Sequence, residues 1–294
     1  MLSPGTSDGF IAWKAASPGA QSINRAAAVL RVLAVHGSQG ASIADVAAAT
    51  GLAASTTHRL LVALVDERLA ERARGSRRYR LGMEIVALGA AAGPNHDLRS
   101  LAKGSLVRIC DQLGHGAHLL VRSGYDGLCI DQRVPDGHAP TIGHVGSRAP
   151  LGVGAAGLAL LAFLNSHEIE EVMAHNRDRL QAHPTFAPDC LKAALASIRR
   201  QGYATATLGH APRMFGLAVP ILDSARRLLA SIGITTISGA RLSGAEVTPL
   251  ARILTDEAWT ISRAYEARYH AESGAKWWNA PHERADADMT GASR

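Results

Sequence analysis

The chain has 294 residues, of which 47% are hydrophobic and 4% aromatic, and its formal net charge is +6 at pH 7. This length and hydrophobic content predict two folded domains, and an odd set of three scattered cysteines excludes a disulfide framework. No basic segment followed by an apolar run begins the chain, and the longest apolar stretch, at 151–164, is too short for a membrane span. We therefore expect a cytoplasmic protein with no membrane partner, a disordered leader at 1–20 and a polar tail at 271–294.

Residues 21–82 have the element order of a winged helix-turn-helix domain. Apolar residues at helical spacing predict a first helix over Ser22–His36. Ser42 is expected to cap a second, short helix that ends at Gly51, and Ser55 is expected to cap a third. The buried stripe of the third helix is expected to comprise Leu60, Leu61, Leu64 and Val65.

The extended runs Leu69–Arg72 and Arg77–Leu81 flank a Gly-Ser turn and predict a hairpin, the wing of such a domain. This wing is rich in arginine, with Glu71 as the one nearby acid: its basic residues are Arg72, Arg74, Arg77, Arg78 and Arg80. Residues 21–96 hold nine arginines against five acidic residues, so most of the net charge lies in this block. Such a hairpin favours contact with phosphates or a minor groove, and a solvated charged loop is the alternative.

The third helix carries the candidate residues for reading DNA. Ser55, Thr56 and Arg59 fall on the face opposite the leucine stripe, at the end that a helix-turn-helix presents to the major groove. Arg59 can reach a guanine edge or a phosphate, and the two hydroxyls suit phosphate or base contacts. A three-helix bundle that touches no DNA is the alternative.

Residues 83–96 are expected to link the two domains. The pattern at Gly82–Ala92 predicts a helix there, and the Gly-Pro-Asn sequence that follows ends it. An apolar helix between two domains is expected to pack on a second copy of itself, which predicts a homodimer and leaves a tetramer open. Residues 97–270 interleave strand pairs with helices and predict an α+β domain. The predicted helices are Leu98–Leu113, Ala155–Phe163, Glu168–His175, Pro188–Gln201 and Thr248–Tyr269, and the predicted strands are His118–Val121, Leu128–Val134, Phe215–Ile221 and Leu228–Thr236.

Several short motifs follow one another along the chain between residue 21 and residue 269. They are Gly51-Leu52, the Ser-Thr-Thr-His-Arg-Leu-Leu of 55–61, Tyr79-Arg80-Leu81-Gly82, Gly146 to Leu151, Gly157 to Phe163, Arg200-Gln201-Gly202-Tyr203 and Ala218 to Ile221. In this order and spacing they resemble the IclR-type transcriptional regulators. The resemblance implies a dimer of winged helix-turn-helix domains on a palindromic or near-palindromic double-stranded DNA operator, with half-sites roughly 34–36 Å apart. It also implies a GAF-like C-terminal domain that binds a small organic effector and thereby alters the arrangement of the DNA-binding domains.

The effector pocket is expected, by the same resemblance, where three short segments converge. Its candidate residues are Gly154, Ala155, Gly216, Leu217, Thr235 and Thr236, although small residues there also suit ordinary close packing. Several positions depart from the family pattern: Gly152–Ala155 replaces a His-Ala-Thr-Ala sequence, Ala204–Thr207 an acidic stretch, and Gly216 a cysteine. The pocket therefore lacks charge, and we hypothesise either an effector that is larger or more apolar than a small keto acid, or a vestigial pocket.

Enzyme and metal chemistry are the main rival interpretations. Cys110, His115, His118 and Cys129 lack the close pair spacing of a metal site and fit buried thiols and ordinary histidines better. The Gly-rich 152–157 lacks the strand and the downstream acid of a dinucleotide-binding unit. No nucleophile and base are nominated together, so we expect no catalysis, no metal and no cofactor. A sensory module with an idle or non-specific DNA-binding domain remains the alternative function.

Overall fold

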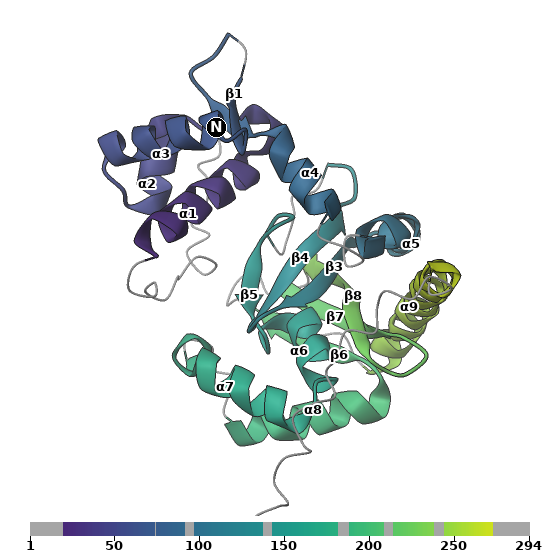
Figure 1. Cartoon of the computed structure of the whole chain (residues 1–294). Helices are drawn as coiled ribbons and strands as arrows, with labels where there is room; N and C mark the ends of the chain where they lie inside the picture. Colours follow the sequence, from purple (N-terminus) through teal and green to yellow (C-terminus); the bar gives the residue numbers. More distant parts are fainter. Residues whose placement is uncertain are drawn as a thin grey trace, which may run out of the picture.

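The computed structural model describes residues 20–73, 75–91, 97–137, 143–181, 188–208, 214–237 and 244–272. All of the expected leader except Ala20, and all of the expected tail except its first two residues, lie outside these ranges, as does Arg74. Two domains joined by a short helix make up the described chain (Figure 1). No single helix among the described residues combines the length and apolarity of a membrane span, although the helices Ile43–Thr50 and Ala54–Asp66, bent by 112° relative to each other, do so as a pair.

The N-terminal domain has the predicted three helices and hairpin. Its elements are α1 (Gln21–His36), the 3-10 turn η1 (Gly37–Gln39), α2 (Ile43–Thr50), α3 (Ala54–Asp66), β1 (Ala70–Arg72) and β2 (Tyr79–Leu81). Val29 and Leu33 of α1, Val46 of α2 and Leu61 of α3 are fully buried and form one core. The prediction for Ser42 is confirmed, because its hydroxyl accepts from the backbone N–H of Asp45 while the Asp45 carboxylate accepts from the Ser42 N–H.

The prediction that Ser55 caps the third helix is wrong. The residue before the helix is Ala53, which offers no side-chain cap, and α3 begins at Ala54. The backbone N–H of Thr57 already bonds the carbonyl oxygen of Ala53 at 2.9 Å, so Ser55 lies inside the first turn. Ser55 is therefore an exposed helical residue whose hydroxyl is not needed by the helix end.

The linker is α4 (Met83–Ala91), close to the predicted range, and it leaves the wing at Gly82. Gly82 packs against the turn after α3 so closely that a Cβ atom there would lie 2.0 Å from the carbonyl oxygen of Arg68. Glycine is therefore required where the linker begins.

The C-terminal domain is built on a six-stranded antiparallel sheet with the order β5-β4-β3-β8-β7-β6. Its strands are β3 (Gly116–Ser123), β4 (Asp126–Arg133), β5 (Arg148–Pro150), β6 (Ala204–Leu208), β7 (Met214–Leu222) and β8 (Leu228–Ile237). Its helices are α5 (Asp97–Leu113), α6 (Gly154–Ala162), α7 (Ser166–Gln181), α8 (Pro188–Gln201) and α9 (Gly244–Glu272). The predicted α+β class is confirmed, while the two edge strands β5 and β6 were not predicted.

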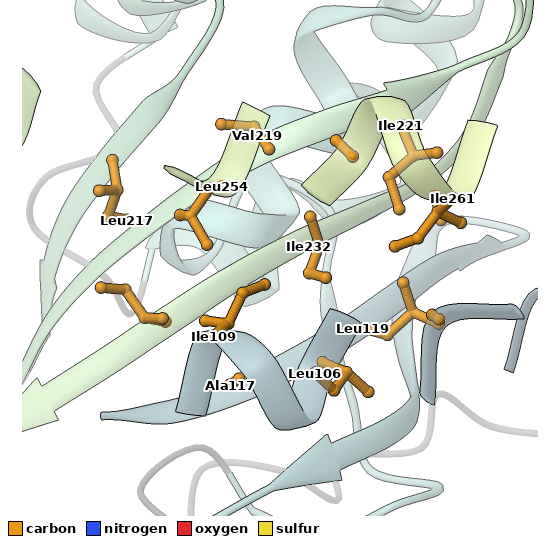
Figure 2. Packing of buried hydrophobic residues seen from close by; sticks show 14 of the residues in the cluster. Leu106, Ile109, Ala117, Leu119, Leu217, Val219, Ile221, Ile232, Leu254 and Ile261 are labelled. Carbon is orange, nitrogen blue, oxygen red and sulfur yellow. The ribbon is translucent and has the colours of Figure 1, made fainter. Parts of the chain in front are cut away.

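Each face of the sheet carries its own helices (Figure 1). Helices α5 and α9 cover one face, where Leu106 and Ile109 meet Leu217, Ile232 and their neighbours in the cluster of Figure 2. Helix α6 covers the other face, with α7 and α8 outside it. Because side chains alternate along a strand, neighbouring residues of β7 belong to different cores.

Helix α6 is held at both ends, which fixes the face that it presents to the sheet. At its C-terminal end, the guanidinium of Arg199 in α8 donates to the carbonyl oxygens of Ala162 and Leu164. Along the helix, the Ser231 hydroxyl of β8 donates to the carbonyl oxygen of Ala156 at 3.1 Å. The N-terminal end of α6 therefore lies over β7 and β8 in a defined position.

Candidate functional sites

The N-terminal half of α3 exposes a polar face to solvent. Ser55 and Arg59 are exposed and Thr56 is half-buried, whereas Thr57 is completely buried. Arg59 makes no hydrogen bond or ion pair with any residue in the described ranges, so its guanidinium is available to a ligand. The expected separation of a polar face from the Leu61 and Leu64 side is confirmed.

The arginines of the wing fall into two groups. Arg78 is tied to the body of its own domain: its Nε donates to the carbonyl oxygens of Gln39 and Gly40 at 3.1 and 2.9 Å, and its Nη2 lies 3.2 Å from Asp45 Oδ2. Arg72 Nε donates to the carbonyl oxygen of Ser76 across the turn, at 3.1 Å.

Arg80 and Arg77 are the other two wing arginines that the structure describes. Arg80 pairs with Glu71 across the two strands. Arg77 is exposed at the tip, with no partner in the part of the chain that the structure describes. Arg77 thus offers its whole guanidinium to an anion, and Arg78 mainly holds the wing against α2.

A cavity lies between the sheet and the N-terminal end of α6. Its empty space is about 720 Å³, part of it open to solvent. Apolar groups form most of its wall, including Leu120, Val153, Ala206 and Met214. The polar side chains on the wall are His118, Cys129, Ser147, Arg148 and Thr235. The expectation that the pocket lacks charge is therefore wrong, because Arg148 belongs to β5, a strand that the sequence analysis did not predict.

Four of the six predicted pocket residues line this cavity: Gly154, Ala155, Gly216 and Thr235. Gly216 and Thr235 are directly opposite each other in the β7–β8 register, on the α6 face. A Cβ atom at Gly216 would lie 3.3 Å from the Cβ of Ala155, so the small residue keeps the cavity floor open.

The other two predicted pocket residues face away. Leu217 is fully buried in the cluster under α5 and α9, and Thr236 is opposite Phe215 of that same cluster. Each is one residue from a cavity residue, and a shift of one along a strand reverses the face. The prediction that they line the cavity is therefore wrong.

Two family models cover most of the described chain. The model for the IclR helix-turn-helix domain matches residues 22–74, and the one described as bacterial transcriptional regulator IclR C-terminal matches residues 90–263. The chain belongs to the IclR family. This IclR-family protein is a transcription regulator with a helix-turn-helix DNA-binding domain and an IclR C-terminal domain.

Relatives of this regulator span nearly the same length. The HTH-type transcriptional regulator XynR of Escherichia coli K12 is 28% identical over 252 residues, which cover 83% of this chain and 96% of XynR. A transcriptional regulator of Rhodococcus sp. RHA1 has a TM-score of 0.63 at 25% identity, covering 84% of this chain and 99% of that one. An IclR homologue of Microbacterium hydrocarbonoxydans, crystallised with 4-hydroxybenzoate, has a TM-score of 0.62 at 23% identity, covering 83% and 99%. The curated relatives are regulators and not enzymes.

Of the polar residues on the wall of the regulator's cavity, the sequence analysis assigned only Thr235 to the pocket; it missed His118, Cys129, Ser147 and Arg148. The His118 side chain is 4% exposed, and its Nδ1 atom has no hydrogen-bond partner among the described residues. Burial lowers the pKa of His118 to about 4, so the imidazole is neutral at physiological pH. The alternation of the predicted strand His118–Val121 puts His118 and Leu120 on one face, which is the signal that could have found it.

Cys110 and Cys129 of the regulator are buried and have no reactive character. Burial raises the pKa of the Cys129 thiol to about 12 and also raises that of Cys110, so both remain protonated. Within the described ranges, no group of three or more His, Cys, Asp or Glu side chains is arranged to hold a metal ion.

Proposed function

We propose that the regulator binds duplex DNA with Ser55, Thr56 and Arg59 of α3 in the major groove and the wing against the backbone. The observation that carries this proposal is Arg59, which is exposed and pairs with no described residue, on a helix whose other face is buried. A guanidinium so presented can bond a guanine edge bidentately. Arg72 and Arg77 of the wing supply charge for phosphates, as does Arg74 by its place in the sequence, whereas Arg78 acts chiefly through its contacts with Gln39, Gly40 and Asp45.

The exposed apolar surface of α4 supports a homodimer. Met83, Val86 and Leu88 are 71%, 60% and 53% exposed, and no residue of α4 is buried within the described chain. Apolar side chains gathered on one linker helix favour a second copy as their cover. A dimer requires two half-sites in a palindromic operator, roughly 34–36 Å apart for two α3 helices on one side of the duplex. Sedimentation analysis of Val86→Glu tests this: a wild-type dimer and a monomeric variant are expected, and a dimeric variant refutes the α4 interface.

Two variants separate the roles of α3 and the wing. Arg59→Ala is expected to weaken operator binding by about 1–3 kcal/mol and to relax the choice of base at one position. Arg77→Ala is expected to weaken operator and random DNA alike and to reduce the salt slope by about one unit. Fluorescence anisotropy at two salt concentrations measures both, on a site recovered from sheared genomic DNA by the purified protein. Unchanged operator binding by Arg59→Ala refutes the assignment of α3.

For the effector, we propose an organic acid with an apolar body, bound in the cavity under α6. Backbone N–H groups at the start of α6 have no side-chain cap, and a helix N-terminus favours a carboxylate. Arg148 adds a positive charge on the same wall, while Leu120, Val153 and Met214 suit an apolar group. The mostly apolar wall favours an effector with an apolar body over a small keto acid, and the polar side chains on it favour a working pocket over a vestigial one. Micromolar binding of glyoxylate or pyruvate in calorimetry contradicts this proposal.

The charge of Arg148 at the cavity also acts electrostatically on a residue of the DNA-binding domain, Arg31. Burial and the positive charge of Arg148 lower the pKa of Arg31, which belongs to α1. An anion bound beside Arg148 offsets the repulsion between these two guanidiniums and so favours an arrangement in which α1 stays close to β5. Replacing Arg148 with Gln is expected to weaken the effect of the effector on operator affinity, without changing operator affinity in its absence by more than a few-fold.

A further inference from the structure

We propose that His118 binds an uncharged oxygen group of the effector, a hydroxyl or a carbonyl, and thereby selects acids that carry such a group on their apolar body. The inference rests on the proposed function, because it takes the same cavity as the effector site. It adds the chemical class of the ligand and the residue that selects it.

The surroundings of His118 leave the Nδ1 atom of its imidazole without a hydrogen-bond partner among the described residues. His118 is paired with Gly233 of β8 in the strand register, and Gly233 has no side chain that could bond the ring. The Ser231 hydroxyl on the same face is committed to the carbonyl oxygen of Ala156, and the Cys129 thiol to that of Asp131 at 3.5 Å. No described residue therefore satisfies Nδ1, although it is buried on the wall of a cavity.

An unsatisfied polar atom in this position points to a ligand. Burying a hydrogen-bonding group without a partner costs free energy, and most buried side-chain polar atoms in proteins have one. A ligand group that bonds the imidazole recovers that cost at the moment of binding. The neighbouring side chains of Leu120 and Met214 on the cavity wall are apolar and do not supply this hydrogen bond.

The partner of His118 must be uncharged. A neutral imidazole has one N–H donor and one nitrogen acceptor, so it can bond a hydroxyl in either direction and a carbonyl as donor. A second carboxylate at this end would bury a negative charge beside a histidine whose pKa burial already lowers to about 4. The single ionised group of the ligand thus belongs at the start of α6 and beside Arg148, where there is charge to meet it.

Calorimetry with four probe acids tests the inference: benzoate, 3-hydroxybenzoate, 4-hydroxybenzoate and the dicarboxylate terephthalate. For the wild-type protein, whichever of the two hydroxybenzoates has the higher affinity is expected to bind on the order of tenfold more tightly than benzoate. Terephthalate is expected to bind more weakly than benzoate. His118→Leu is expected to reduce the hydroxyl preference to within twofold while benzoate still binds. His118→Asn keeps a donor and an acceptor near the place of Nδ1 and is expected to retain part of the preference.

His115→Leu is the matched control, because it removes a half-buried imidazole one residue before the same strand and outside the cavity wall. It should leave the hydroxyl preference unchanged. Operator binding by each variant verifies that the protein is folded. A wild-type protein that binds benzoate and both hydroxybenzoates equally, or a preference that survives in His118→Leu, overturns the role of His118 and leaves the organic-acid proposal standing. If none of the four acids binds, the proposed effector chemistry fails and the role of His118 fails with it.

Discussion

Replacing His118 with leucine should make the folded regulator less sensitive to mild acid. Burial lowers the pKa of His118 from 6.5 to about 4, so in the folded state the imidazole stays neutral between these values, while in the unfolded chain it takes up a proton below about pH 6.5. The unfolded state therefore binds more protons in this window, and the free energy of unfolding falls as the pH falls through it. Below about pH 4 both states are protonated, and the contribution no longer changes.

The size of this effect follows from the shift itself. A difference of one pKa unit corresponds to about 1.4 kcal/mol, so His118 alone removes on the order of 3 kcal/mol of stability between pH 6.5 and pH 4, and about 2 kcal/mol by pH 5. The free energy of unfolding of an ordinary domain is about 5–15 kcal/mol in total, so a loss of this size is easily measured.

The assay is urea unfolding followed by circular dichroism at pH 7, 6 and 5, on the wild-type protein and His118→Leu. The wild type is expected to lose about 2 kcal/mol more than the variant over this range. His167→Gln is the control, because the His167 side chain is 81% exposed and its replacement should leave the slope unchanged. If His118→Leu loses stability with the same slope as the wild type, the reasoning about a buried neutral imidazole is refuted.

Three further predictions concern the wing, the cavity and the linker. Arg78→Ala should lower the stability of the N-terminal domain by about 1 kcal/mol, because it removes bonds to two carbonyls and Asp45, whereas Arg77→Ala should leave stability unchanged; equal midpoints in thermal unfolding contradict the distinction. Gly216→Val should fill the cavity floor beside Ala155 and abolish binding of organic acids while operator binding remains, and calorimetry that still detects the acids counts against the cavity as their site. Gly82→Ala should lower the free energy of unfolding of the N-terminal domain by at least about 2 kcal/mol, because the new Cβ would lie 2.0 Å from the Arg68 carbonyl oxygen. An unchanged midpoint in thermal unfolding would show instead that the backbone at this position adapts freely.

The local elements of the N-terminal domain could be predicted because their signals are local. Ser42 and Asp45 are three residues apart and form their capping box within one turn of α2, and Gly51 adopts the left-handed conformation that ends that helix. The apolar spacing of α1 and α3 likewise fixes which face is buried. Ser55 was misassigned because a serine near a helix start satisfies the same pattern whether it lies at the cap or two residues inside.

Only the tertiary structure decided which residues meet in the sites. β5 has three residues, one of them Pro150, and β6 is built of alanines, threonines and one leucine, so both are strands only because β4 and β7 lie beside them. The β7–β8 register assigns Gly216 and Thr235 to the cavity and Leu217 and Thr236 to the opposite face. The sequence determined the family, the helix-turn-helix and the basic wing; the pairing of distant strands determined the cavity and left His118 buried in its wall, because hydrogen-bond register depends on partners that no local pattern specifies.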